Sequence, residues 1–244
     1  MTFENFPKAP VQEALIDLRV TFKDVPVQSQ FESIAQGIQN HYPKRDVLHQ
    51  HQTTVKFDGD KSAAEHDARF SGLRFESPDR NFVFQAQLGG FTISKLRPYS
   101  DWNELLVEAR KLWAVYCQNL SPISVERIAC RYINRFDVPA APFDFKEYLV
   151  CPPEVPSALP QGVSKYFVQM EIPLPELRAT ALVNQVLEGV NDSVATIILD
   201  FDVFRTYSYD INEGLWWSDL GLLRDWKNRF FFASITEKTK EMFR

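Results

Sequence analysis

Two stretches of the chain alternate between apolar and polar side chains, and this period of two constrains the fold more than any other feature. In the run Ala14–Phe22 every second residue is apolar, whereas Glu13, Asp17 and Arg19 occupy alternate positions between them. A second strand pattern covers residues Val125 to Phe136. Because successive side chains of a strand point to opposite faces, both stretches are predicted to be strands of a sheet, with apolar and charged side chains sorted to opposite sides.

The rest of the chain shows one order of patterns twice, in which a meander of strands is followed by an amphipathic helix. In the first half, strand patterns lie near residues 47–57, 69–76, 81–87 and 91–97, and a helix begins at Asp101. In the second half, strand patterns lie near residues 164–172, 178–188 and 194–207, and a long helix lies near 215–242. The apolar stripe predicted for this helix consists of Trp216, Leu220, Leu223, Trp226, Phe230, Phe231 and Ile235. The sequence therefore predicts an α+β fold made of two meander-plus-helix halves with antiparallel sheets. An internal duplication would explain the repeat, although two meanders can also arise without one.

Proline marks the boundary between the halves. The segment 138–162 contains Pro139, Pro142, Pro152, Pro153, Pro156 and Pro160. Such a density prevents a continuous helix or strand. We therefore expect an N-terminal α+β half over residues 1–138, a Pro-rich connector over 139–162, and a C-terminal meander plus long helix over 163–244.

Net charge and the number of cysteines restrict the binding partners and the cellular compartment that we expect. The net charge of −5 argues against general nucleic-acid binding, which usually requires an excess of Lys and Arg. Local binding of nucleic acid by Arg127, Arg131 and Arg135 stays open as an alternative that this charge disfavours. The three cysteines are an odd number at wide spacing, which is typical of reduced thiols rather than of a disulfide framework. The N-terminus lacks the pattern of a signal peptide, and no apolar run approaches the roughly 18 residues of a membrane span. We expect a cytoplasmic protein that does not enter a membrane.

Several short segments together carry a resemblance to a known family. They are Pro10–Val20, Tyr42-Pro43, Leu96–Trp102, Arg131–Arg135 and Lys227–Glu237. In their order and spacing the chain resembles a sporadically distributed bacterial family of uncharacterised proteins of about this length, known only by a numbered TIGR-type name. The resemblance implies no established activity and no catalytic residues. The patchy distribution of the family implies mobile genetic islands, and with them a role in phage defence or in a toxin–antitoxin system.

Charged residues on the two predicted strands form the first candidate site. Arg127, Arg131 and Arg135 recur every four residues, so all three point to one side of the sheet. One interpretation is a solvated face on which they form salt bridges, each worth about 0–1 kcal/mol, with residues of the first strand. The other is an arginine-lined groove that binds an anionic ligand, because guanidinium groups match phosphate and carboxylate. The anionic-ligand candidates are Arg127, Arg131, Arg135, Glu13, Asp17 and Arg19.

Two carboxylates offer a metal site. Asp200 and Asp202 are two residues apart on a strand pattern, so they share a face and could hold Mg²⁺. With the arginines nearby, they support an alternative function as a metal-dependent enzyme that acts on a phosphorylated or nucleotide substrate. The chain has no phosphate-binding loop, dinucleotide fingerprint or nucleophile elbow.

Surplus aromatic residues favour a binding protein instead. Trp216-Trp217 and Phe230-Phe231-Phe232 are adjacent on a helical pattern, and one stripe of a helix cannot bury all of them. Trp217 and Phe232 are therefore candidates for a partner interface, with a broad buried helix face as the other interpretation. The favoured hypothesis is a non-enzymatic binding or regulatory protein that needs no cofactor and binds a protein partner, an anionic partner or a second copy of itself.

Overall fold

One antiparallel sheet connects both halves of the described chain. The computed structural model describes residues 3–58, 61–139, 144–191 and 193–244. Nine strands pair in the order β2-β3-β4-β5-β1-β6-β9-β8-β7 within this part of the chain. Their bounds are β1 (Val11–Thr21), β2 (Lys44–Asp58), β3 (Lys61–Ser77), β4 (Phe82–Gln87), β5 (Gly90–Leu96), β6 (Ser124–Pro139), β7 (Tyr166–Leu174), β8 (Ala179–Val190) and β9 (Val194–Asp210). With the helices beside it, this sheet confirms the predicted α+β class.

The two halves of the chain have similar topologies, although the first half contains one more strand and an additional helix, Gln28–Ile38. Strand β1 precedes the meander β2–β5 and a helix, and β6 precedes the meander β7–β9 and another helix. The first strands of the halves, β1 and β6, pair at the centre of the sheet, with Ile16 opposite Cys130. Each is flanked on its outer side by the last strand of its own meander, β5 or β9. The two predicted meander-plus-helix halves are confirmed, and they share one sheet.

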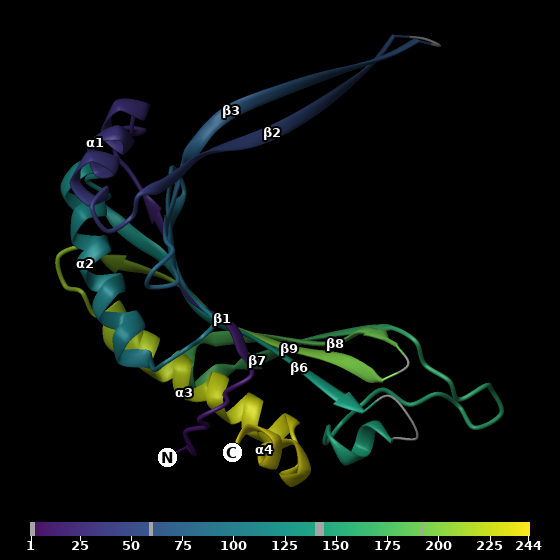
Figure 1. Ribbon diagram of the computed structural model, residues 1–244. Coiled ribbons are helices and arrows are strands. Elements are labelled where there is room, and N and C mark those ends of the chain that lie inside the picture. The colour runs from purple at the N-terminus through teal and green to yellow at the C-terminus, as the bar shows by residue number, and fades with distance from the viewer. Residues whose placement is uncertain (1–2, 59–60, 140–143, 192) are drawn as a thin grey trace.

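Helices cover one face of this sheet and leave the other open (Figure 1). The helices are α1 (Gln28–Ile38), α2 (Trp102–Leu120), α3 (Trp216–Ser234), α4 (Glu237–Phe243) and the 3-10 turns η1 (Phe145–Glu147) and η2 (Pro175–Leu177). The alternation predicted from the sequence determines which face is covered, since Ala14, Ile16 and Leu18 point toward the helices and are fully buried. None of the helices in the described ranges has the length and apolar content that crossing a membrane requires.

The C-terminal helical region differs from the single helix predicted near 215–242. Helix α3 ends at Ser234, and a new helix begins after Thr236, whose side-chain oxygen accepts a hydrogen bond from the Thr239 backbone nitrogen. Ile235 between them is extended and forms a β-bridge with Leu149 of the connector. A capping threonine after an extended residue starts a second helix in a new direction, so the long helix is broken here.

The hairpin β2–β3 is longer than its strand patterns indicate. The pattern predicted at residues 69–76 begins at Lys61 in the structure, and the hairpin extends away from the helix-covered part of the sheet (Figure 1). Residues 61–68 show no alternation of apolar and polar side chains. Backbone pairing with a neighbouring strand does not require a buried face, which is why the apolar pattern underestimated this arm.

The two ends of the chain lie together beside α3 and α4 (Figure 1). The backbone nitrogen of Lys8 donates a hydrogen bond to the carbonyl oxygen of Phe243 at 3.0 Å. Arg244 also forms an ion pair with Glu4 at 2.7 Å. The N-terminal segment is thereby held against the C-terminal helices, where it forms one wall of the cavity described below.

Candidate functional site

The open face of the sheet carries the charged residues that the strand patterns singled out. Arg127 lies between two carboxylates, since its guanidinium group contacts Asp17 at 3.0 Å and Asp202 at 3.2 Å. Arg131 binds both carboxylate oxygens of Asp200, at 2.8 and 2.7 Å. These residues come from the central strands β1, β6 and β9, whose antiparallel register places them side by side.

The other predicted members of this face lie toward its margins. Arg135 contacts the exposed Glu188 at 3.0 Å, and Arg19 contacts Asp17 at 3.0 Å. Glu13 is half-buried on the same face. All six predicted residues therefore share one side of the sheet, but each of the four arginines is engaged by a carboxylate.

The predicted metal pair is also engaged. Both oxygens of Asp200 accept hydrogen bonds from Arg131, and Asn184 donates a further one to Oδ2 at 3.0 Å. Oδ1 of Asp202 is buried and lacks a hydrogen-bond partner, and burial raises the pKa of this carboxyl group. No cluster of three metal-ligating side chains occurs among the residues that the structure describes. A cation at this pair would have to compete with the guanidinium groups already present.

The two aromatic candidates for a partner interface pack within the chain. Trp217 is half-buried and stacks under the guanidinium group of Arg110, 5.4 Å from its ring centre. Phe232 is half-buried between the N-terminal rings of Phe3 and Phe6, with centroid distances of 5.3 and 5.5 Å. Phe232 therefore helps to hold the N-terminal segment against α3.

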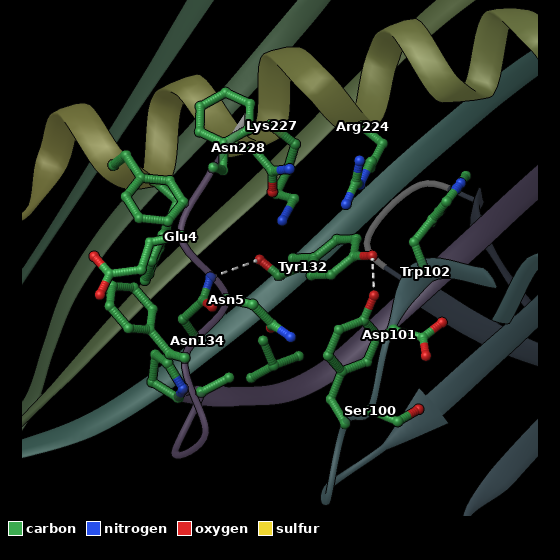
Figure 2. Close-up of a pocket in the computed structure, with 18 residues that line it drawn as sticks. Glu4, Asn5, Ser100, Asp101, Trp102, Tyr132, Asn134, Arg224, Lys227 and Asn228 are labelled. Carbon is green, nitrogen blue, oxygen red and sulfur yellow. Dashed lines mark hydrogen bonds between the residues drawn. The ribbon is translucent and has the colours of Figure 1, made fainter. Parts of the chain in front are cut away.

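A cavity of about 280 Å³ lies on the helix-covered side, between this N-terminal segment, the turn before α2, strand β6 and helix α3 (Figure 2). Its walls are partly aromatic, with Phe6, Trp102 and Phe231 among them. Its polar residues include Tyr99, Tyr132, Asn134, Arg224, Lys227 and Asn228. Four of the five segments that carry the family resemblance contribute to these walls.

Lys227 is the most unusual residue of the cavity. Its side chain is directed from α3 toward Tyr132, and its Nζ atom lies 3.5 Å from the centre of that ring (Figure 2). Only 7% of the residue is exposed, and within the described residues its ammonium group has no hydrogen-bond or ion-pair partner. An ammonium group that loses its water without gaining an anion is disfavoured. Burial, and to a smaller extent the nearby cation Arg224, lower the pKa of Lys227 to about 7.

Lys227 occupies this place because of its helical spacing. It lies four residues after Leu223 and four before Phe231, and all three belong to the buried side of α3. Arg224, one turn earlier, also points toward Tyr132 (Figure 2). Its only ion pair among the described residues is a 3.4 Å contact with the partly exposed Asp225. The carboxylates Glu4 and Asp101 also line the cavity, but Glu4 pairs with Arg244 and Asp101 caps α2.

The floor of the cavity is polar although it belongs to the apolar side of β6. Tyr132 and Asn134 alternate with outward-pointing residues and are both buried. The hydroxyl groups of Tyr132 and Tyr99 are 2.7 Å apart, and the Asn134 amide donates a hydrogen bond to the Leu199 carbonyl at 3.1 Å. The side chain of Asn228 is 8% exposed and makes no hydrogen bond to the described residues. The cavity therefore combines unpaired donors with apolar walls, which is the composition of a site for a small anionic molecule.

Sequence patterns alone did not point to this cavity. The apolar stripe predicted for the C-terminal helix was traced through Trp226 and Phe230, which are half-buried, and it passed over Lys227 and Asn228, which are buried. One signal for the cavity was present in the sequence. Lys227 lies four residues after Leu223 and four before Phe231, which places a lysine on the apolar side of the helix. The chain matches no protein-family model and has no significant similarity to a curated protein, so the family resemblance remains a prediction.

Proposed function

We propose that this protein is a binding protein that holds a small anionic ligand in the cavity beside Lys227. The observation that carries the proposal is the buried ammonium group of Lys227, which has no anionic partner among the described residues. Proteins rarely bury a charge unless it is paired or functional. A ligand carboxylate or phosphate would supply the missing charge and the missing hydrogen-bond acceptor.

The second cation of the cavity supports the same function. Arg224 and Lys227 lie one helical turn apart and are both directed toward Tyr132 (Figure 2). A planar guanidinium group can bind two oxygens of one carboxylate, while an ammonium group adds a compact charge beside it. The unpaired amide of Asn228 adds a further donor on the same helix. Three donors from one rigid helix are suited to orienting an anion.

The size of the cavity restricts the ligand. Its volume of about 280 Å³ is below the usual range of roughly 300–1,000 Å³ for drug-sized molecules. The rings of Trp102 and Phe231 provide apolar surface for a short ligand body. A small organic acid matches both the volume and the mixed lining.

The arginines of the open sheet face support ligand binding less well. Arg127 and Arg131 already contact buried carboxylates of the protein itself. An anion that bound there would have to displace these ion pairs or compete with their negative charge. We therefore place anion binding on the helix-covered side, at Lys227.

Calorimetric titration with acetate, benzoate and inorganic phosphate tests this function. At about pH 6, where Lys227 is mostly protonated, we expect the wild-type protein to bind at least one of the three anions. Lys227→Met should weaken that binding about 10- to 100-fold, because hydrogen bonds to charged groups contribute strongly. Lys95→Met is the matched control, since Lys95 is also buried but lies outside the cavity, and it should bind the anion like the wild type. Failure of all three anions to bind, or equal binding by Lys227→Met, would refute the proposal.

A further inference from the structure

The amine of Lys227 has the surroundings of a nucleophile. It reaches the cavity, only 7% of the residue is exposed, and no carboxylate among the described residues pairs with it. Desolvation and a neighbouring cation are the two conditions that leave a lysine amine unprotonated at neutral pH. With a pKa of about 7, a large share of Lys227 carries a free lone pair under conditions in which an exposed lysine is almost fully protonated.

The groups around the amine do not offer it a competing reaction partner. They come from β6, from α3, from the turn before α2 and from the N-terminal segment. The titratable or charged members are Cys130, Tyr132, Arg224, Asp225, Tyr99, Asp101 and Glu4. Burial raises the pKa of Cys130 to about 12 and raises that of Tyr132, so both side chains stay neutral. Glu4 is bound to Arg244. The amine is therefore free to react with a molecule that enters the cavity.

Arg224 determines which reactive molecule would fit. Its guanidinium group lies one helical turn before Lys227 and points to the same ring (Figure 2). A ligand carboxylate bound by Arg224 would place its neighbouring carbon close to the amine of Lys227. A carbonyl group at that carbon is the arrangement found in a 2-oxo acid.

We propose that Lys227 captures a small 2-oxo acid covalently, as an imine formed through its Nζ atom, while Arg224 binds the carboxylate of the acid. The inference rests on the proposed function, because both use the same cavity and the same cations. The two proposals use the two protonation states of one amine, since the ammonium form binds anions and the free amine attacks a carbonyl group.

The reaction needs no additional reagent. The lone pair of Nζ forms a bond to the carbonyl carbon, and the carbonyl oxygen takes up a proton to become a hydroxyl group. Nitrogen then loses one proton, and the hydroxyl group leaves as water after a second protonation, which forms a carbon–nitrogen double bond. The nitrogen finally gives up its remaining proton, and this restores the second proton that the oxygen took up. The amine and the carbonyl compound are thus converted into an imine and one water molecule, with no net oxidation or reduction.

Reductive trapping tests the inference. The wild-type protein is incubated with glyoxylate and cyanoborohydride near pH 7, and the modified lysines are identified by peptide mass mapping. We expect modification at Lys227 at least about tenfold faster than at the exposed Lys111 or the buried, paired Lys95. Lys227→Arg should show no adduct at this position while its circular dichroism spectrum is unchanged. Equal labelling of all three lysines, or no labelling of Lys227, would overturn the inference.

A second comparison separates the two proposals. Arg224→Gln should slow trapping of glyoxylate about tenfold relative to trapping of the neutral propanal, because only glyoxylate has a carboxylate for Arg224 to bind. If acetate or benzoate binds and glyoxylate is not trapped, the covalent step is refuted and the anion-binding function stands. If neither binding nor trapping occurs, both fail.

Discussion

Among the residues whose burial the structure describes, two lysines are buried on the helix-covered side of the sheet, and their surroundings differ. Lys95 of β5 is 6% exposed, and its ammonium group donates to Glu104 at 3.1 Å and to the Arg80 carbonyl at 2.6 Å. Lys227 of α3 is 7% exposed, and its ammonium group lies over the ring of Tyr132 and makes no hydrogen bond or ion pair to the described residues. Lys95 also lies over a ring, that of Phe82 at 4.6 Å, so the contrast is in the hydrogen bonds and the carboxylate.

The difference separates a structural lysine from a functional one. A buried cation with its anion and acceptors in place stabilises the fold around it, whereas a buried cation without them is a net cost that folding alone does not explain. The cost at Lys227 is compatible with a stable protein because the surrounding core is large and continuous. Such a costly position is expected where binding requires it.

The largest expected effect is on the pH dependence of stability. In the folded protein the pKa of Lys227 is about 7, whereas in the unfolded chain it returns to the ordinary value near 10.5. Between these values the unfolded state binds more protons, so stability increases as the pH rises through this window. We expect the wild-type free energy of unfolding to rise by about 2 kcal/mol between pH 7 and pH 9, measured by urea denaturation.

The control for this prediction is Lys227→Met. The variant has no titrating group at this position, so its stability should rise less over the same pH range, and at pH 7 it should be more stable than the wild type. Other groups that titrate in this window are common to both proteins and cancel in the comparison. Parallel pH profiles for the two proteins would mean that Lys227 already has an ordinary pKa.

A smaller loss of stability is expected at the paired lysine. Lys95→Met removes the ion pair to Glu104 and leaves the Arg80 carbonyl without its donor. We expect the free energy of unfolding at pH 7 to fall by about 1.5 kcal/mol, since Glu104 is partly exposed and regains water. At pH 7 the two Lys→Met substitutions should therefore change the free energy of unfolding in opposite directions, and this difference tests the comparison most directly. A stabilising Lys95→Met would remove the distinction between the sites.

The sequence was sufficient to predict those elements whose structure follows from the local spacing of apolar and polar side chains. Alternation in residues 14–22 and 125–136 predicted both central strands, and the spacing of Arg127, Arg131 and Arg135 predicted their common face. It was not sufficient for the pairing of β1 with β6, which joins residues more than one hundred positions apart, such as Leu15 and Arg131. Local patterns carry no information about which distant strands become neighbours.

The cavity could not be predicted for a related reason. Its walls come from four separate parts of the chain, and its main residue, Lys227, breaks the apolar stripe that was used to predict the helix. A polar residue on a buried face can be a paired residue such as Lys95 or an unpaired one such as Lys227. The partner groups, Glu104 in one case and none among the described residues in the other, are contributed by the tertiary fold.

The smallest expected effects on stability concern the arginines on the open face of the sheet. Each of the predicted arginines there is paired with a carboxylate, but the carboxylates differ in burial. Arg131 pairs with Asp200, whose side chain is 9% exposed, whereas Arg135 pairs with Glu188, whose side chain is 51% exposed. We expect Arg131→Gln to lower the free energy of unfolding by about 1 kcal/mol, because a buried carboxylate loses its cation. Arg135→Gln should cost about 0.3 kcal/mol, and this cost should disappear at high salt. Neither substitution should change the binding of anions that we assign to Lys227. If Arg131→Gln binds an anion more weakly than the wild type while its fold is intact, the anion binds on the open face of the sheet and not at Lys227.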